Sequence, residues 1–136
     1  YDLDKSMEKA VSAYFKMGEK KFHAAEILYR NEQYEDTVSR AYYAVLHAVK
    51  ALLLTEDVQV RSHEGARQMF NFHFIQSNKF PKNLAKSLRN LQDDRETGDY
   101  DASSTLDEAD AKTALVESQD FLNQTKTYLQ KIGIPL

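Results

Sequence analysis

An arginine and a histidine, Arg40 and His47, lie seven positions apart in an otherwise apolar stretch of the chain. In a helix, seven steps of about 100° return both side chains to nearly one line, about 10 Å apart along the axis. Guanidinium is a permanently charged fork for phosphate oxygens, and imidazole both donates and accepts protons near neutral pH. The pair therefore predicts a single anion site with the groups that phosphodiester chemistry needs.

The same pair also fits a purely structural interpretation. Arg40 could form an ion pair, and His47 could fill a polar gap between helices, because this spacing also arises by chance. Both interpretations stay open on the sequence alone.

A second group of charged side chains lies at residues 93–101, where a helix is expected to end. Loops on rigid scaffolds often carry functional residues, although a solvated turn with Arg95 paired to a carboxylate is the structural alternative. His63 could contribute to the same cleft or cap the helix that it begins. The candidates for substrate binding are Tyr43, His63, Arg95, Asp99 and Tyr100.

Metal and cofactor sites are not predicted. The carboxylates of residues 93–101 lack the glycine and ligand spacing of a calcium loop, and no histidine pair has the spacing of a zinc site. The chain has no cysteine, which excludes disulfides and thiolate ligands and suits a reducing cytoplasm. We expect no metal, no cofactor and a cytoplasmic location.

The composition is that of a globular domain. With 136 residues, 42% hydrophobic and 29% charged, the chain predicts one domain over residues 1–136. Its formal charge of −3 gives no global positive field, so a contact with RNA must be local. The apolar run at residues 51–54 is far too short to span a membrane, and no membrane partner is expected.

Few glycines and prolines, and almost no alternation of the strand type, predict an all-α fold. We expect helices at residues 5–30, 34–54, 63–77 and about 81–97, then a loop at 98–104. Thr105 and Glu108 form a capping box for a last helix, which ends near residue 132 before Gly133. The economical packing is an up-and-down bundle of four main helices plus one short helix.

The expected helix at residues 34–54 has two different faces. Ala44 and Ala51 share the line of Arg40 and His47, and such small residues let another backbone approach closely, so this line predicts a second interface. The predicted core face comprises Val38, Tyr42, Val45, Val49, Leu52 and Leu53.

The run Ser39-Arg40-Ala41-Tyr42-Tyr43-Ala44, continuing through His47 to Leu53, resembles the second-helix signature of the HEPN family. The resemblance continues with Ser62-His63-Glu64-Gly65 and with residues 95–101, as in small stand-alone HEPN proteins, and it covers nearly the whole chain. It implies a bundle of four main helices plus a short one, usually assembled as a two-fold homodimer.

The resemblance also implies a function. Arg40 and His47 fit the long form of the Arg-x4-6-His motif found in metal-independent ribonucleases of the family. Ala41 stands where many active members have Asn, Asp or His, and Ala48-Val49 follow His47 in place of the His-x-Tyr ending of the toxin branch. Some relatives work beside a small nucleotidyltransferase, as in toxin–antitoxin pairs, and others are non-catalytic binding domains.

Three hypotheses follow from the sequence. The first is RNA binding with endonucleolytic cleavage, in which a homodimer brings Arg40 and His47 of both copies into one cleft. The line of Ala44 and Ala51 is the surface on which the second copy is expected to approach. The second is a non-catalytic helical module that binds a nucleotide or a nucleotidyltransferase partner. The third is a structural dimer in which the pair has no ligand.

Overall fold

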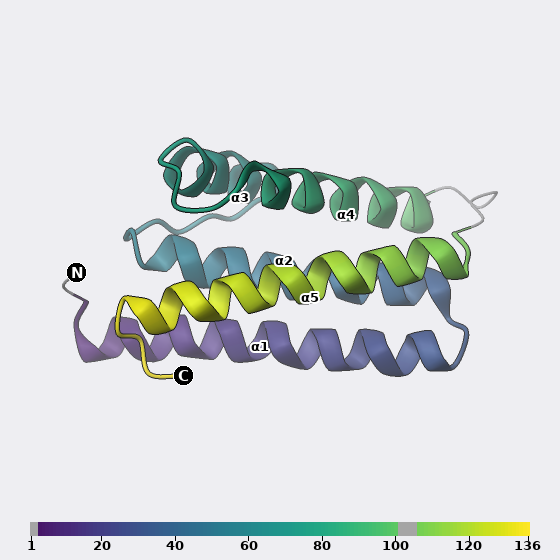
Figure 1. Ribbon diagram of the computed structural model, residues 1–136, viewed down its shortest axis with the longest axis horizontal. Coiled ribbons are helices and arrows are strands. Elements are labelled where there is room, and N and C mark those ends of the chain that lie inside the picture. The colour runs from purple at the N-terminus through teal and green to yellow at the C-terminus, as the bar shows by residue number, and fades with distance from the viewer. Residues whose placement is uncertain (1–2, 101–105) are drawn as a thin grey trace.

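The computed structural model describes residues 3–100 and 106–136, with Tyr100 described by its backbone alone. The elements are α1 (Lys5–Arg30), α2 (Tyr34–Leu54), α3 (His63–Phe70), the π-helical turn η1 (Asn71–Ile75), α4 (Lys82–Tyr100) and α5 (Glu108–Lys131). The predicted all-α bundle of four main helices plus a short one is confirmed (Figure 1). Within these ranges, no helix has the length and apolar character needed to cross a bilayer.

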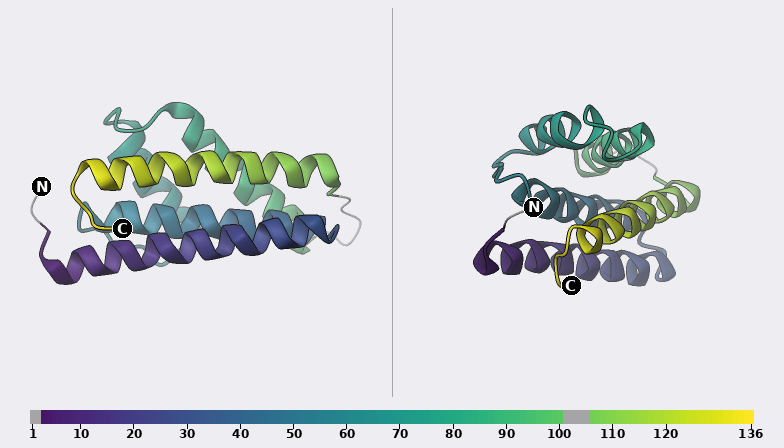
Figure 2. Two further views of the ribbon diagram at one scale, coloured as in Figure 1. Left: turned by 60° about the horizontal axis from the view of Figure 1, so that its bottom comes forward. Right: turned by 60° about the vertical axis from the view of Figure 1, so that its left-hand side comes forward.

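Helix α2 is the centre of the bundle. It contacts α1, α3, α4 and α5, and Figures 1 and 2 show α1 on one side of it and the α3–α4 layer on the other. Its predicted core face is correct, because all six of its residues are 0% exposed: Val38, Tyr42, Val45, Val49, Leu52 and Leu53. The helix that carries Arg40 and His47 is therefore fixed from both sides.

A glycine of α1 allows the backbones of α1 and α2 to lie very close together. A Cβ added to Gly18 of α1 would lie 2.8 Å from the carbonyl oxygen of Ala44, so only glycine lets the two backbones approach this far. Ala44 and Ala51 are both 0% exposed within the single chain. The predicted line of small residues does admit another backbone, but the prediction that this backbone belongs to a second copy is wrong, because α1 occupies the place.

The first two helices begin and end at the predicted residues. The third does not continue as an α-helix to residue 77, because it changes to the π-helical turn η1 after Phe70. In η1 the Gln76 amide donates to the Asn71 carbonyl at 2.8 Å. Phe70 and Phe74 are both buried and stack at 5.8 Å between ring centroids, so aromatic packing accompanies the wider turn.

Helix α4 runs through Gly98 to Tyr100, so the prediction of a helix end and a loop at Gly98 is wrong. A Cβ at Gly98 would lie 3.1 Å from Leu106 Cδ1, and this glycine therefore makes room for a neighbouring side chain inside a helix. The rest of the predicted loop, 101–104, lies outside the described residues.

The start of α5 also differs from the prediction. Its N-cap is Asp107, which forms a capping box with Asp110, and not the predicted pair of Thr105 and Glu108. Thr105 itself lies outside the described residues. The predicted end of the helix is correct, because Gly133 follows α5 with a φ of 91°.

Enlarging Gly18 will destabilise the fold. We expect Gly18→Leu to lower the free energy of unfolding by about 2–3 kcal/mol, because the new side chain meets a backbone carbonyl that cannot move alone. The measurement is urea denaturation followed by circular dichroism. Ala13→Leu, which adds a similar side chain at an exposed position of α1, is the control and should change stability by less than about 0.5 kcal/mol. Equal effects of the two substitutions would contradict the close packing described here.

Candidate functional site

Arg40 and His47 lie in one surface groove between α1 and α2, here named the α1–α2 groove. Its volume is about 530 Å³. Helix α2 contributes Asp36, Ser39, Arg40, Tyr43 and His47, and α1 contributes Met17, Lys21 and Leu28. Arg40 is exposed and His47 is half-buried, so both groups of the predicted anion site face a cavity open to solvent.

The Arg40 guanidinium is available to a ligand. Among the residues that the structure describes, Arg40 makes no ion pair and its side chain makes no hydrogen bond, so the structural ion pair considered from the sequence is not found there. Lys21 of α1 lines the same groove and adds a second positive charge, opposed by Asp36. The groove therefore carries a local positive charge on a chain whose formal charge is negative.

His47 is held in one tautomer by its own helix. Its Nδ1 lies 2.7 Å from the carbonyl oxygen of Tyr43, one turn earlier. A carbonyl can only accept, so Nδ1 carries the proton and Nε2 of the neutral ring keeps its lone pair. The geometry assigns Nε2 as the proton acceptor of the groove.

The surroundings of His47 favour its neutral form. Burial lowers the pKa of His47, and the charges of Lys50 and Lys21 lower it further, against an opposing effect of the hydrogen bond to Tyr43. Because the pKa lies below its ordinary value of about 6.5, the ring is mostly neutral at pH 7. This is the protonation state that a general base requires.

Behind the groove lies a second set of side chains, here named the Arg95 cluster: Tyr42, Tyr43, His63, Arg95 and Asp99. The Arg95 side chain reaches from α4 to α2 and is only 9% exposed. Its Nη1 donates to the Tyr43 hydroxyl at 2.9 Å and lies 3.4 Å from Asp99 Oδ2. The guanidinium carbon lies 5.4 Å and 5.6 Å from the ring centroids of Tyr42 and Tyr43.

His63 belongs to this cluster through its ring. The ring lies 5.4 Å from that of Tyr42 and 6.0 Å from that of Tyr43, measured between centroids. Burial lowers the pKa of His63, and the charges of Arg95 and Lys50 act in the same direction, with Glu96 opposing them. The cap of α3 is Ser62, whose Oγ accepts from the Gly65 amide at 2.8 Å, so of the two alternatives for His63 the helix cap is not found and the position beside Arg95 is.

The structure thus brings together four of the five predicted binding residues, Tyr43, His63, Arg95 and Asp99. Tyr43 is the member that the groove and the Arg95 cluster share. Tyr100 ends α4, but its side chain lies outside the description. Whether these residues bind a substrate stays a prediction. Arg95 contacts Tyr43 and does not itself line the groove.

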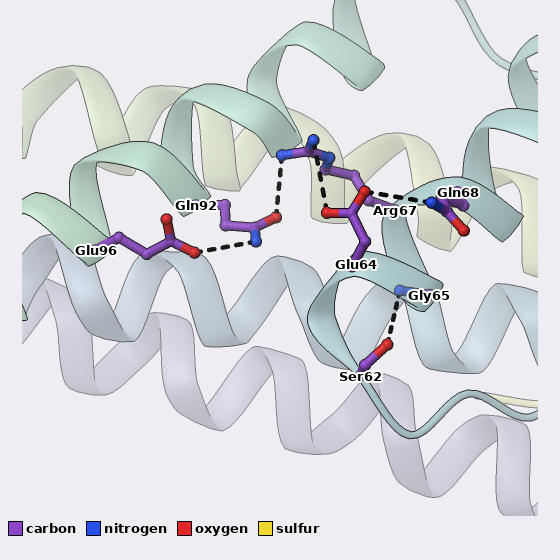
Figure 3. A network of polar contacts seen from close by, with 7 residues as sticks. All are labelled: Ser62, Glu64, Gly65, Arg67, Gln68, Gln92 and Glu96. Carbon is purple, nitrogen blue, oxygen red and sulfur yellow. Dashed lines mark hydrogen bonds and ion pairs between the residues drawn. The ribbon is translucent and has the colours of Figure 1, made fainter.

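A polar network joins α3 to α4 beside the cluster (Figure 3). Arg67 of α3 donates to Gln92 of α4 at 3.3 Å and pairs with Glu64 at 3.8 Å. Gln92 continues the network to Glu96 at 3.2 Å. These contacts hold α3 and α4 together at the height of His63 and Arg95.

Sequence reasoning missed Lys21 as a groove residue. Lys21 lies one helical turn after the groove residue Met17, so the two side chains share a face of α1. This four-residue spacing could have identified Lys21 from the sequence. Among the described residues, no group of three His, Cys, Asp or Glu side chains is arranged to hold a metal ion.

Comparison with known proteins shows the class. A family model, described as HEPN domain, matches residues 11–128. The chain therefore belongs to the HEPN domain family, as the sequence resemblance indicated.

Individual relatives share most of the chain. A Methanocaldococcus jannaschii protein named "Putative toxin MJ0142" is 38% identical over 128 residues, which cover 94% of this chain and 82% of the relative. A second protein of that organism, "Putative toxin MJ0605", is 30% identical over 130 residues, 96% of each chain. A Thermotoga maritima "UPF0332 protein" is 30% identical over 108 residues, 79% of this chain and 82% of the relative.

The protonation of His47 can be tested directly. We expect Lys50→Gln to raise the pKa of His47, because it removes a positive charge that disfavours the imidazolium ion. Long-range ¹H–¹⁵N correlation spectra across a pH titration report both the pKa and the tautomer. Lys9→Gln, on the part of α1 near Pro135, is the control and should leave the titration unchanged. A ring protonated at Nε2 in its neutral form would contradict the assignment.

Proposed function

We propose that this HEPN domain binds RNA in the α1–α2 groove and cleaves it without a metal ion. The observation that carries the proposal is the exposed Arg40 guanidinium beside a neutral imidazole whose Nε2 is free to accept a proton. RNA supplies both the phosphate for Arg40 and the 2′-hydroxyl for His47. We propose a cytoplasmic location with it, because cellular RNA is present there.

The proposed reaction is an internal transesterification. His47 Nε2 accepts the proton of a ribose 2′-hydroxyl while the 2′-oxygen attacks the adjacent phosphorus. The bond from phosphorus to the 5′-oxygen breaks, and that oxygen takes a proton from an acid. The products are a 2′,3′-cyclic phosphate and a 5′-hydroxyl. Arg40 stabilises the negative charge that grows on the non-bridging oxygens.

Proton delivery to the leaving 5′-oxygen calls for a second group. We assign it to His47 of a second copy in a two-fold homodimer, since one copy offers one such histidine in its groove. In this arrangement the two copies meet across their α1–α2 grooves, where Met17 at the edge is 43% exposed. The alanine line cannot serve as the interface because α1 covers it.

The alanine after the motif arginine does not alter the groove. Ala41 is 0% exposed, and its carbonyl accepts from Ser118 of α5 at 3.1 Å, so this position faces the core. The departure from the family pattern therefore removes no side chain from the set that lines the α1–α2 groove.

A second candidate function is supported by the size of the groove. A volume of about 530 Å³ lies in the range of small-molecule sites, and a mononucleotide would fit the charges of Arg40 and Lys21. In this case the protein is a non-catalytic module that binds a nucleotide or a nucleotidyltransferase partner. Calorimetric binding of a nucleotide, lost in Arg40→Ala and unaccompanied by RNA cleavage, would favour it.

The names of two relatives support a role in growth control. We propose that the chain acts as the toxin of a toxin–antitoxin pair, with RNA as its target. If so, its expression in bacterial cells slows growth, and expression of His47→Ala at the same level does not.

RNA cleavage is the main test. We expect purified protein to cleave mixed RNA in the presence of a chelator, and His47→Ala and Arg40→Ala each to lower the rate by at least about 100-fold. Gel electrophoresis with analysis of the cyclic phosphate ends is the measurement.

Matched controls come from the same chain. His23→Ala and Arg89→Ala remove exposed groups that do not line the groove and should cleave at the rate of the unaltered protein. Cleavage that persists in His47→Ala, or that stops when the metal is chelated, would contradict the mechanism.

The pH dependence should follow His47. On its acidic limb the rate is expected to rise with pH as the His47 that acts as base loses its proton, with the midpoint below about 6.5 because burial and nearby lysines lower this pKa. At higher pH the rate should fall again as the His47 that acts as acid loses its own proton. Lys21→Gln removes one of those charges, so the acidic limb should move to higher pH. An acidic limb that stays in place in Lys21→Gln would exclude His47 as the base.

A further inference from the structure

Tyr43 is tied to both halves of the site at once. Its backbone carbonyl accepts from His47 Nδ1 at 2.7 Å, and its hydroxyl accepts from Arg95 Nη1 at 2.9 Å. The same residue lines the α1–α2 groove. A shift in the position of Tyr43 would therefore also move the ring of His47, the proton acceptor of the groove.

The hydrogen bond from Arg95 determines how the Tyr43 hydroxyl can use its own hydrogen. Guanidinium has only donors, so Arg95 occupies a lone pair of the Tyr43 oxygen and leaves the hydroxyl hydrogen to another acceptor. In the ranges that the structure describes, the Tyr43 hydroxyl accepts from Arg95 and donates no hydrogen bond of its own. A phenol that accepts from a cation becomes a stronger donor toward a second partner.

Arg95 is well placed to hold this arrangement. Its side chain is 9% exposed, it packs against the rings of Tyr42 and Tyr43, and Asp99 pairs with it at 3.4 Å. Such a buried guanidinium has little freedom to turn toward solvent. It acts on the groove through Tyr43.

The order of residues on α2 completes the argument. Arg40, Tyr43 and His47 occupy positions i, i+3 and i+7, which form one stripe along a helix. An anion held between Arg40 and His47 therefore lies alongside Tyr43, which is half-buried and forms part of the groove wall.

We propose that the Tyr43 hydroxyl donates a hydrogen bond to a non-bridging phosphate oxygen in the α1–α2 groove, and that Arg95 is the positioning residue that directs this proton. The proposal rests on the proposed function, because it needs a phosphodiester in the groove. It assigns to Tyr43 a contact with phosphate and not with a base.

The test compares two linkages. A fluorescently labelled single-stranded RNA is titrated with the full chain, beside the same sequence carrying neutral methylphosphonate linkages, and anisotropy gives both dissociation constants. Their ratio measures the preference for a charged phosphate oxygen. We use His47→Ala as the background, so that cleavage does not consume the RNA.

We expect Tyr43→Phe to reduce this preference by about tenfold, the value of one charge-assisted hydrogen bond. Phenylalanine keeps the ring, so stacking on a base and the packing of the cluster survive. Tyr29→Phe, which removes a hydroxyl bonded to Glu108, is the matched control and should leave the preference unchanged.

The role of Arg95 is read from a double-mutant cycle. Arg95→Met should reduce the preference like Tyr43→Phe, and the two together should cost no more than either alone. Arg95→Lys, which retains a cationic donor, should restore part of the preference. Thermal denaturation followed by circular dichroism verifies that each variant is folded, and Tyr43→Phe alone decides the proposal if Arg95→Met is not.

The outcomes separate the two proposals. If Arg40→Ala abolishes the preference and Tyr43→Phe leaves it intact, the Tyr43 contact is wrong and the groove is still a phosphate site. An equal loss of affinity for both linkages in Tyr43→Phe also overturns the contact. If Arg40→Ala leaves RNA binding unchanged, or no binding occurs, the proposed function and the inference both fail.

Discussion

A glycine of α1 lies against a backbone carbonyl of α2, and the position of every groove residue follows from that contact. Gly18 allows α1 to approach Ala44 of α2 very closely. The groove between the two helices is therefore lined by Met17 and Lys21 from α1 and by Arg40 and His47 from α2. With α2 also fixed by α3, α4 and α5, its polar stripe has a constant orientation. The candidate site is thus a consequence of backbone packing.

Much of the fold could be predicted because helical periodicity is a local signal. The bounds of α1 and α2, and the buried face of α2, were predicted from the spacing of apolar residues. The end of α4 and the start of α5 were less predictable. A glycine often marks the end of a helix, yet Gly98 lies inside α4 and leaves room for the side chain of Leu106, which precedes α5.

The site shows the same division between local and tertiary information. The common direction of Arg40 and His47 is a property of a single helix, and the sequence was sufficient to predict it. The sequence could not show which helix would cover Ala44, or that Arg95 would bond to the Tyr43 hydroxyl. Both features depend on packing between helices that are distant in sequence, and local periodicity carries no information about such packing.

Protonation of His47 has opposite effects on anion binding and on proton acceptance in the groove. Acidification adds a positive charge beside Arg40 and Lys21 and so increases the attraction for an anion. The same proton occupies Nε2 and removes the only imidazole lone pair that the tautomer leaves open. A mildly acidic medium therefore favours retention of a polyanion over its turnover, and a neutral medium favours the reverse.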